Sequence, residues 1–209
     1  GGSYSCPACA ESIQSGSFVN NDGTLNVGTG STWQCTLNNN STGTVTDGGN
    51  GAQIILGSSS TVNNYGTYVS RTSATSGTFN NFSTGTLIMP TTCSFSLNNS
   101  GQLLNSGTIS IPAGTGLNVN AGATLTNNST GTILNNASLS VAATATMSNH
   151  GTYKGSGAFG PSLFTNQSSG YVAPGNSPGC LTFNNGFTTN GTLDIEANGT
   201  TACTQHDRI

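Results

Sequence analysis

A Gly-Thr dipeptide recurs along almost the whole chain and constrains its fold more than any other feature. Thr follows the glycine in every repeat but one, where Tyr171 follows Gly170. Consecutive repeats lie 19 to 24 residues apart. The glycines are Gly23, Gly43, Gly66, Gly85, Gly107, Gly131, Gly151, Gly170 and Gly191. A period of this length is typical of a solenoid, in which one small structural unit stacks on the next.

Each repeat carries apolar residues at two positions that we expect to point into a core. The first position follows the Gly-Thr pair and is occupied by Leu25, Val45, Tyr68, Leu87, Ile109, Ile133, Tyr153, Val172 and Leu193. The second lies a few residues before the glycine and is occupied by Phe18, Leu37, Val62, Phe79, Leu104, Leu125, Met147, Phe164 and Phe187. Short β-branched segments between turns, without helical periodicity, favour strands. We therefore predict an all-β fold, a single parallel β-helix (β-solenoid) of about nine coils with a period near 21 residues.

An asparagine lies between the two apolar positions of each repeat. These residues are Asn21, Asn40, Asn64, Asn81, Asn105, Asn128, Asn149, Asn166 and Asn190. Asn and Gly both tolerate left-handed backbone, so the segment is expected to be a turn between strands. In stacked coils the amides would form a hydrogen-bonded ladder, as they do in cross-β assemblies. The repeated motif thus predicts architecture rather than chemistry.

The repeats divide the chain into three parts. We expect an N-terminal cysteine-containing tail or cap over residues 1–17, the β-solenoid over 18–199 and a C-terminal tail over 200–209. Coils spaced by about 4.8 Å would give a rod roughly 40 Å long.

The charge content excludes several classes of partner. Only 4% of the residues are charged and the formal net charge is -3. The basic residues, Arg71, Lys154 and Arg208, are too scattered to form a phosphate-binding stripe, so we expect no nucleic-acid partner. No apolar run reaches the length of a membrane span, and we expect a soluble, secreted chain whose leader has been removed.

The six cysteines indicate an oxidising, extracellular setting, and we interpret them as disulfide candidates. Cys180 and Cys203 lie about one period apart, so we expect them to pair across neighbouring coils. Cys35 and Cys93 lie nearly three periods apart, beyond the reach of a disulfide. Cys6 and Cys9 are the remaining candidates: the tail reaches Cys35 more easily, and the tail of a neighbouring chain is a candidate partner for Cys93.

The last repeat carries a second motif, "APGNSPGCLTFNNGFTTNGTLDIEANG", followed by "HDRI" at residues 206–209. This stretch resembles the β-helical passenger regions of bacterial autotransporters and related haemagglutinin-like surface adhesins, in a Pro-Gly-x-Ser-Pro-Gly-x-Leu segment, a Gly-Thr-Leu-x-Ile-Glu strand and an Asp-Arg-Leu-like ending. The matching residues are Pro174, Gly175, Ser177, Pro178, Gly179, Leu181, Gly191 to Glu196, and Asp207 to Ile209. The resemblance implies a secreted bacterial right-handed β-helix. Such chains usually continue toward an anchoring domain, so either the protein is cut here or it is held in another way.

The sequence contains few residues that could carry out catalysis. Asp194 and Glu196 share one strand face and are the best candidate for a carboxylate pair, but a solvated strand face is the simpler interpretation. His150 and His206 have no clustered ligand partners, and we expect neither an active site nor a metal or cofactor.

Two further features concern the surface. The Thr of each Gly-Thr pair would form a row on a charge-poor rod, resembling the flat Thr face of ice-binding solenoids, although strand propensity also explains these residues. The row consists of Thr24, Thr44, Thr67, Thr86, Thr108, Thr132, Thr152 and Thr192. Asn-x-Ser/Thr sequons permit glycan attachment at Asn39, Asn40, Asn81, Asn98, Asn127, Asn128, Asn136, Asn166, Asn190 and Asn198.

We predict that the chain is a non-enzymatic, extracellular structural protein at the cell surface, a β-solenoid subunit of a self-assembling filament or adhesin stalk. Open solenoid ends favour head-to-tail stacking, so the expected partners are copies of the chain, with glycans or host surfaces as further candidates. The alternative is an ice-binding or carbohydrate-binding solenoid that uses the Thr-rich face.

Overall fold

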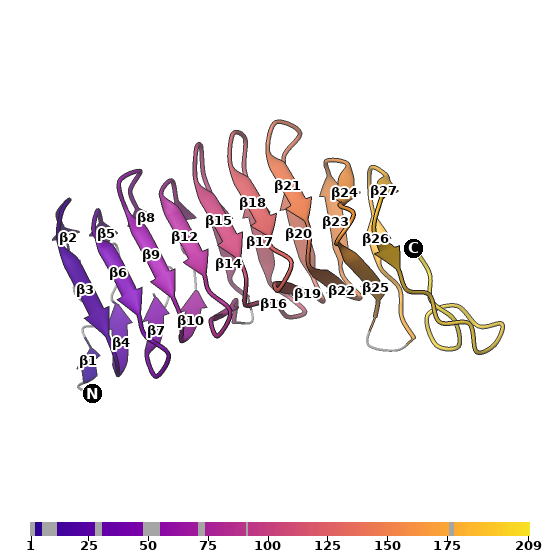
Figure 1. The fold of residues 1–209 in the computed structure, drawn as a ribbon, viewed down its shortest axis with the longest axis horizontal. Helices are drawn as coiled ribbons and strands as arrows, with labels where there is room; N and C mark the ends of the chain where they lie inside the picture. The colour runs from indigo at the N-terminus through magenta and orange to yellow at the C-terminus, as the bar shows by residue number, and fades with distance from the viewer. Residues whose placement is uncertain are drawn as a thin grey trace.

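The computed structural model describes residues 3–5, 12–27, 31–47, 55–70, 74–90, 92–175 and 178–209. These residues form short strands and turns that coil along one axis, so that the molecule is a rod with its two termini at opposite ends (Figure 1). In this part of the chain we find no helix of the length and hydrophobicity that crossing a membrane requires. The prediction of an all-β solenoid is confirmed.

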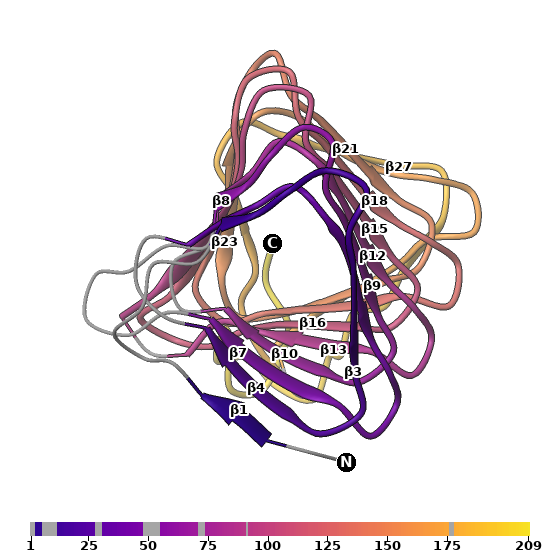
Figure 2. The ribbon, with the colours of Figure 1, turned by 90° about the vertical axis from the view of Figure 1, so that its left-hand side faces the viewer.

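The strands form three parallel sheets, which give the rod a triangular cross-section (Figure 2). Sheet A contains β1 (Ser3–Ser5), β4 (Thr24–Val27), β7 (Thr44–Asp47), β10 (Thr67–Ser70), β13 (Thr86–Ile88), β16 (Thr108–Ile111), β19 (Thr132–Asn135), β22 (Thr152–Gly155), β25 (Tyr171–Pro174) and β28 (Thr192–Leu193). Sheet B contains β2 (Ser12–Ile13), β5 (Thr32–Trp33), β8 (Ile55–Leu56), β11 (Ala74–Thr75), β14 (Ser94–Leu97), β17 (Gly116–Val119), β20 (Ser138–Val141), β23 (Ala158–Pro161) and β26 (Thr182–Phe183). Sheet C contains β3 (Phe18–Asn21), β6 (Thr36–Asn39), β9 (Thr61–Asn64), β12 (Thr78–Asn81), β15 (Gln102–Asn105), β18 (Thr124–Asn127), β21 (Thr146–Asn149), β24 (Phe164–Asn166) and β27 (Phe187–Thr189).

The regular part of the solenoid is shorter than the nine equal coils we predicted. Within the described residues, about seven turns with a period of about 22 residues make up the regular stack. At the C-terminal end the last strands of sheets B and A, β26 and β28, have only two residues each.

Strict alternation along each strand separates core from surface. In most strands the second and fourth residues are buried and the first and third are partly exposed, as in Thr44–Asp47. This is the two-residue period of a strand with one face on a core. Near the C-terminal end the core becomes aromatic, and rings of Tyr153, Phe159, Phe164 and Phe183 lie within 4.8 to 6.4 Å of one another, centroid to centroid.

The first predicted apolar row lies inside sheet A except at its last position, where Leu193 is 37% exposed, and the second is correct except at two positions. Phe18 is 72% exposed, because its neighbour Val19 takes the inward register beside Leu37. Leu104 faces outward in the same way, and Leu103 is buried in its place. At both sites two apolar residues are adjacent, and strand alternation admits only one of them.

Sheet B supplies a third wall of the core that the repeat analysis missed. Its inward residues include Trp33, Phe95, Leu97 and Leu117, all buried. The wall was missed because its distance from the Gly-Thr pair changes along the chain, from 10 residues after the motif glycine at Phe95 to 13 at Leu56 and 8 at Leu139. The alternating segments Ser94–Leu97 and Ser138–Val141 are the sequence signal that would have identified this sheet.

An asparagine ladder runs inside the corner between sheets C and A. Each buried amide donates through Nδ2 to the Oδ1 of the equivalent residue in the next coil, at 2.7 to 2.8 Å. The ladder consists of Asn21, Asn39, Asn64, Asn81, Asn105, Asn127, Asn149 and Asn166, and ends at Thr189, whose Oγ1 accepts from Asn166 at 3.0 Å. Three of our assignments were therefore wrong: Asn40, Asn128 and Asn190 each follow the true ladder residue and point away from the core.

Asn40 and Asn128 each follow a ladder asparagine in a long turn, whereas at Asn190 the ladder position is occupied by Thr189. The turn that follows the ladder alternates between two lengths. From ladder residue to motif glycine, the short turns span two residues, as from Asn105 to Gly107, and the long turns span four, as from Asn127 to Gly131. A hydroxyl of each long turn donates to a carbonyl of the short turn below it, for example Thr130 to Ser106 at 2.9 Å. The same contact joins Thr42 to Asp22, Thr84 to Tyr65 and Ser169 to His150. The structural repeat is therefore a pair of coils.

The motif glycines are required by close packing between coils. We expected positive φ at these positions, but the glycines with positive φ lie elsewhere among the described residues. A Cβ on Gly131 would lie 2.4 Å from the carbonyl oxygen of Asn105, and one on Gly66 would lie 2.3 Å from that of Gly43. Only a residue without a side chain lets the coils approach this closely.

The sheets extend beyond the solenoid boundaries that we assigned. Strand β1 pairs with β4 and strand β2 pairs with β5, so two sheets begin within residues 1–17. At the other end, the last residues return to the final coil, where Arg208 pairs with Cys180.

Candidate functional site: a C-terminal clasp and patterned outer faces

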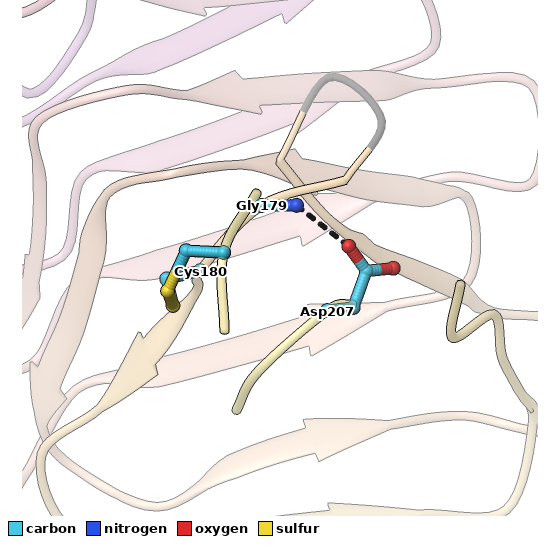
Figure 3. Close-up of a disulfide and its surroundings, with 4 residues drawn as sticks. Gly179, Cys180 and Asp207 are labelled. Carbon is cyan, nitrogen blue, oxygen red and sulfur yellow. Dashed lines mark hydrogen bonds between the residues drawn. A yellow bond between two sulfur atoms is a disulfide. The ribbon is translucent and has the colours of Figure 1, made fainter. Parts of the chain in front are cut away.

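Asp207 joins three segments that are distant in the sequence. Its Oδ1 accepts a hydrogen bond from the backbone N–H of Gly179 at 2.6 Å (Figure 3). Its Oδ2 accepts one from the N–H of Glu196 at 2.9 Å. The Asp207 side chain is buried. An ionised carboxylate that accepts two backbone hydrogen bonds is a strong anchor, because each bond is charge-assisted.

The backbone beside Asp207 completes this contact. The N–H of Arg208 donates to the carbonyl of Gly179 at 3.0 Å, and its own carbonyl accepts from Leu181 at 2.9 Å. A disulfide joins Cys180 to Cys203 with a Cα–Cα distance of 4.9 Å, the pairing that their spacing predicts. We call this assembly of residues 179–181, 196 and 203–208 the clasp.

The clasp explains the second sequence motif in physical terms. The Pro-Gly segment supplies Gly179, the strand after the last Gly-Thr pair supplies Glu196, and the "HDRI" ending supplies Asp207. Gly175 has φ of +72°, and a Cβ on Gly175 would lie 2.3 Å from the Cα of Gly179. Both glycines are therefore needed for the chain to turn back on itself here.

Of the other suggested pairings, the one for Cys35 is not formed, and the one between Cys93 and the tail of a neighbouring chain stays a prediction. Cys35 and Cys93 are both free thiols. Cys35 lies in the hydrophobic core cluster, where an external tail cannot reach it, and its burial raises the pKa of the thiol. Cys93 is partly exposed, while Cys6 and Cys9 lie outside the described residues.

The predicted Thr row lies on the outer face of sheet A. Register partners connect Thr24, Thr44, Thr67, Thr86, Thr108, Thr132 and Thr152 in one line, followed by Tyr171 and Thr192. The neighbouring outward row is mixed and includes Val69, Ile88, Ser110, Leu134 and Lys154. The face is thus regular in one row only.

The outer face of sheet C carries a second asparagine ladder that the sequence analysis missed. Asn38 donates to Asn20 at 2.8 Å, and Asn63 donates to Asn38 and Asn80 to Asn63 at 2.9 Å. The sequence signal is the Asn-Asn doublet, as in Asn38-Asn39. Strand alternation directs one member of each doublet outward and the other into the core.

Burial divides the candidate glycosylation sites into two groups. Four of them, Asn39, Asn81, Asn127 and Asn166, belong to the internal ladder and are at most 1% exposed, so a glycan does not fit on the folded chain. The other six, Asn40, Asn98, Asn128, Asn136, Asn190 and Asn198, are partly or fully exposed.

The two carboxylates considered for catalysis lie beside the clasp. Asp194 is exposed and accepts a hydrogen bond from the phenol of Tyr171. This bond, with the burial of the ring and the charges of Asp194 and Glu196, raises the pKa of Tyr171. His150 lies in a short turn and His206 lies in the clasp, where its Nδ1 contacts the carbonyl of Gly199 at 3.2 Å. Across the described ranges, no three His, Cys, Asp or Glu side chains gather closely enough to hold a metal ion.

Comparison with known proteins gives one finding. No protein family matches the sequence, and no curated protein matches it. Among solved structures, the chain is similar to the crystal structure of a TibC-catalysed hyper-glycosylated fragment of TibA. The match has 16% sequence identity and a TM-score of 0.23, and it covers 92% of this chain and 87% of that chain.

Proposed function

We propose that this chain is a non-enzymatic extracellular structural protein, a β-solenoid unit of a surface filament or adhesin stalk that stacks head to tail. The observation that carries the proposal is the constant register of three parallel sheets, whose strand edges face along the rod axis. Unpaired strand edges are templates for pairing with another chain. Contacts between unlike ends do not close on themselves and so build a filament.

Strand β3 is the edge of sheet C at one end of the rod. The carbonyls of Ser17 and Asn21 accept hydrogen bonds from the next coil, from Thr36 and Asn40. Because alternate residues of a strand bond to the same neighbour, the backbone groups of Phe18 and Asn20 face away from the rod. We infer that these groups pair with the preceding copy.

At the other end Arg208 of the clasp pairs with Cys180, just before β26, the last strand that the structure describes in sheet B. Strands β27 and β28 are the last strands that the structure describes in sheets C and A. Leu193 and Ile195 are exposed beside them, at 37% and 45%. These two sheets and their apolar neighbours favour a docking surface for the next copy.

The test uses two variants of Phe18. Phe18→Pro removes an N–H that the fold does not use, and Phe18→Thr keeps the N–H and introduces the residue found at Thr36 and Thr61 in the same outer row. Electron microscopy and sedimentation of material isolated without reductant are expected to show rods for the wild type and Phe18→Thr and single units for Phe18→Pro. Discrete short particles of the wild type at micromolar concentration would contradict the proposal of head-to-tail assembly.

An extracellular location is supported by the disulfide and by the low charge. With three basic residues in the chain, trypsin-like proteases have few sites to cut, which suits a surface fibre.

The second candidate is a binder that uses the Thr row of sheet A, favoured by the unbroken line from Thr24 to Thr152. Thr86→Tyr and Thr132→Tyr disrupt this line on the surface. Loss of ice or polysaccharide binding in these variants supports the binder, and no effect with intact assembly removes it.

A further inference from the structure

A hollow of about 310 Å³ lies on the outer face of sheet A, next to the clasp. It is lined by Thr152, Lys154, Tyr171, Ala173, Pro174 and Glu196, among others. This volume is at the lower end of the roughly 300–1,000 Å³ range of small-molecule sites. The lining residues come from β22, β25 and the segment after β28.

One departure from the repeat, at Tyr171, and one small residue, Ala173, shape this hollow. In all other repeats Thr follows the motif glycine, whereas here Tyr171 takes its place. An aromatic ring therefore stands in the Thr row between Thr152 and Thr192. In the neighbouring outward row, Ala173 is the register partner of Lys154. A small residue beside two large ones leaves a recess whose floor is Ala173 and Pro174.

The recess also gathers charges on a rod that has few. Lys154 lies on one side of Ala173, and on the other side the N–H of Asp194 donates to Val172, which places Asp194 in the next strand position. Glu196 lines the same hollow. Two residues of opposite charge, Lys154 and Glu196, therefore line one small site, and Asp194 lies on the strand beside it.

These groups fit a polyhydroxyl ligand. The ammonium of Lys154 donates, the carboxylate of Glu196 accepts and the hydroxyl of Thr152 does both, as the hydroxyl groups of a sugar require. The phenol of Tyr171 donates its proton to Asp194 and therefore acts toward a ligand as an acceptor. Charges of both signs do not select a strongly charged ligand. The apolar floor is too small for a large apolar molecule but suits the C–H face of one sugar ring, with the Tyr171 ring at its side.

We propose that the hollow formed by Lys154, Tyr171, Ala173 and Glu196 is a saccharide-binding site for one or two sugar units. The clasp positions one wall of this site, because Asp207 holds both the N–H and the carbonyl of Glu196. The site does not depend on head-to-tail assembly, and of the Thr row it uses only Thr152.

The experiment measures binding of named sugars to the full chain by saturation-transfer NMR. The probes are glucose, galactose, mannose, N-acetylglucosamine and their β-1,4-linked disaccharides, with diglycine as a zwitterionic competitor. For an open site of this size we expect a Kd on the order of 1 mM for the best saccharide. Tyr171→Thr restores the residue of the repeat and is expected to weaken binding at least tenfold, and Glu196→Gln about fivefold.

Two controls separate binding from folding. Tyr171→Phe keeps the ring and loses the hydroxyl, so it is expected to bind more tightly than Tyr171→Thr. Tyr65→Thr removes a tyrosine that is 38% exposed in a turn on another corner and is expected to leave Kd unchanged. The proposal is overturned if no saccharide gives a signal, if Tyr171→Thr and Glu196→Gln bind as the wild type does, or if diglycine binds in place of the sugars.

Discussion

The carboxylate of Asp207 accepts a hydrogen bond from the backbone N–H of Gly179, 28 residues earlier in the chain, at 2.6 Å. Because its second oxygen accepts from Glu196, one buried side chain holds the last strand, the Pro-Gly segment and the C-terminal residues together.

Asp207→Asn is expected to open the clasp. The amide replaces one acceptor oxygen with a donor that faces a backbone N–H, at a cost of about 2 kcal/mol. Because each coil of a solenoid contacts only its neighbours, the loss is expected at the C-terminal end. Hydrogen exchange should show faster exchange at Gly179 and Glu196. Asp22→Asn, at an exposed carboxylate, is the control, and equal exchange in both variants would contradict the role of Asp207.

Removal of the Cys180–Cys203 disulfide is expected to loosen the same end. The bridge closes a loop with a sequence separation of 23 residues. For a loop of this length, chain entropy predicts a stabilisation of about 3 kcal/mol. The double variant Cys180→Ser/Cys203→Ser should release residues 194–208 to limited proteolysis while the central coils stay protected. Loss of protection along the whole chain would instead indicate a single cooperative unit.

Gly131→Ala tests the close approach between coils. Its Cβ would lie 2.4 Å from both the carbonyl oxygen of Asn105 and the Oδ1 of Asn127, so we expect destabilisation by about 3 kcal/mol or more. Gly116→Ala is the matched control, since its Cβ has no neighbour closer than 3.7 Å. Because alanine has a lower backbone entropy than glycine in the unfolded chain, Gly116→Ala should stabilise the protein by about 0.5 kcal/mol. Thermal unfolding of both variants decides between packing and a general intolerance of substitution.

Two adjacent asparagines distinguish the ladder from its surroundings. Asn127 donates to Asn149, Gly131 and Thr152, while Asn128 points outward and donates to Ser106. Asn127→Ala leaves buried partners unsatisfied and should cost about 3 kcal/mol, whereas Asn128→Ala should cost less than about 1 kcal/mol. Denaturant unfolding measures both. Similar losses for the two variants would argue against an internal ladder.

The phenol of Tyr171 predicts a pH dependence at the C-terminal end. Its pKa is raised, chiefly by the hydrogen bond to Asp194, above the ordinary value of about 10. The neutral phenol is therefore favoured in the folded state, and its contribution is present below about pH 10 and lost as the pH rises through the raised pKa. NMR titration of the tyrosine rings should show that Asp194→Asn lowers the midpoint of Tyr171. An unchanged midpoint would mean that this hydrogen bond does not control the titration.

The sequence predicted the solenoid because the Gly-Thr repeat reports two physical requirements in every coil. The glycine permits close approach, and the residue after Thr, such as Ile109, fills the core of sheet A. Sheet B was missed since its inward residues stand at different distances from the motif glycine in different coils, 13 residues at Leu56 and 8 at Leu139. The turn alternation was missed because an amide one position later, at Asn128, fits the same sequence pattern as Asn127.

The candidate sites were predicted less completely, because they depend on contacts between residues that are far apart in the sequence. Cys180 and Cys203 lie about one period apart, so stacking alone brings them together. The role of Asp207 depends on Gly179, a contact that no local pattern encodes. The hollow beside Tyr171 likewise depends on register between coils, although the replacement of Thr by Tyr marks its place in the sequence.

Successive members of the internal ladder are separated by anything from 17 to 25 residues, yet their amides stay 2.7 to 2.8 Å apart. Extra residues are thus taken up sideways, in the corners, and add nothing to the rise along the axis. The length of the rod is therefore set by the number of coils and not by the number of residues in each coil. Insertions and deletions in the corners leave the position of every outward side chain along the rod axis unchanged. The surface pattern can therefore be kept while the length of the chain changes.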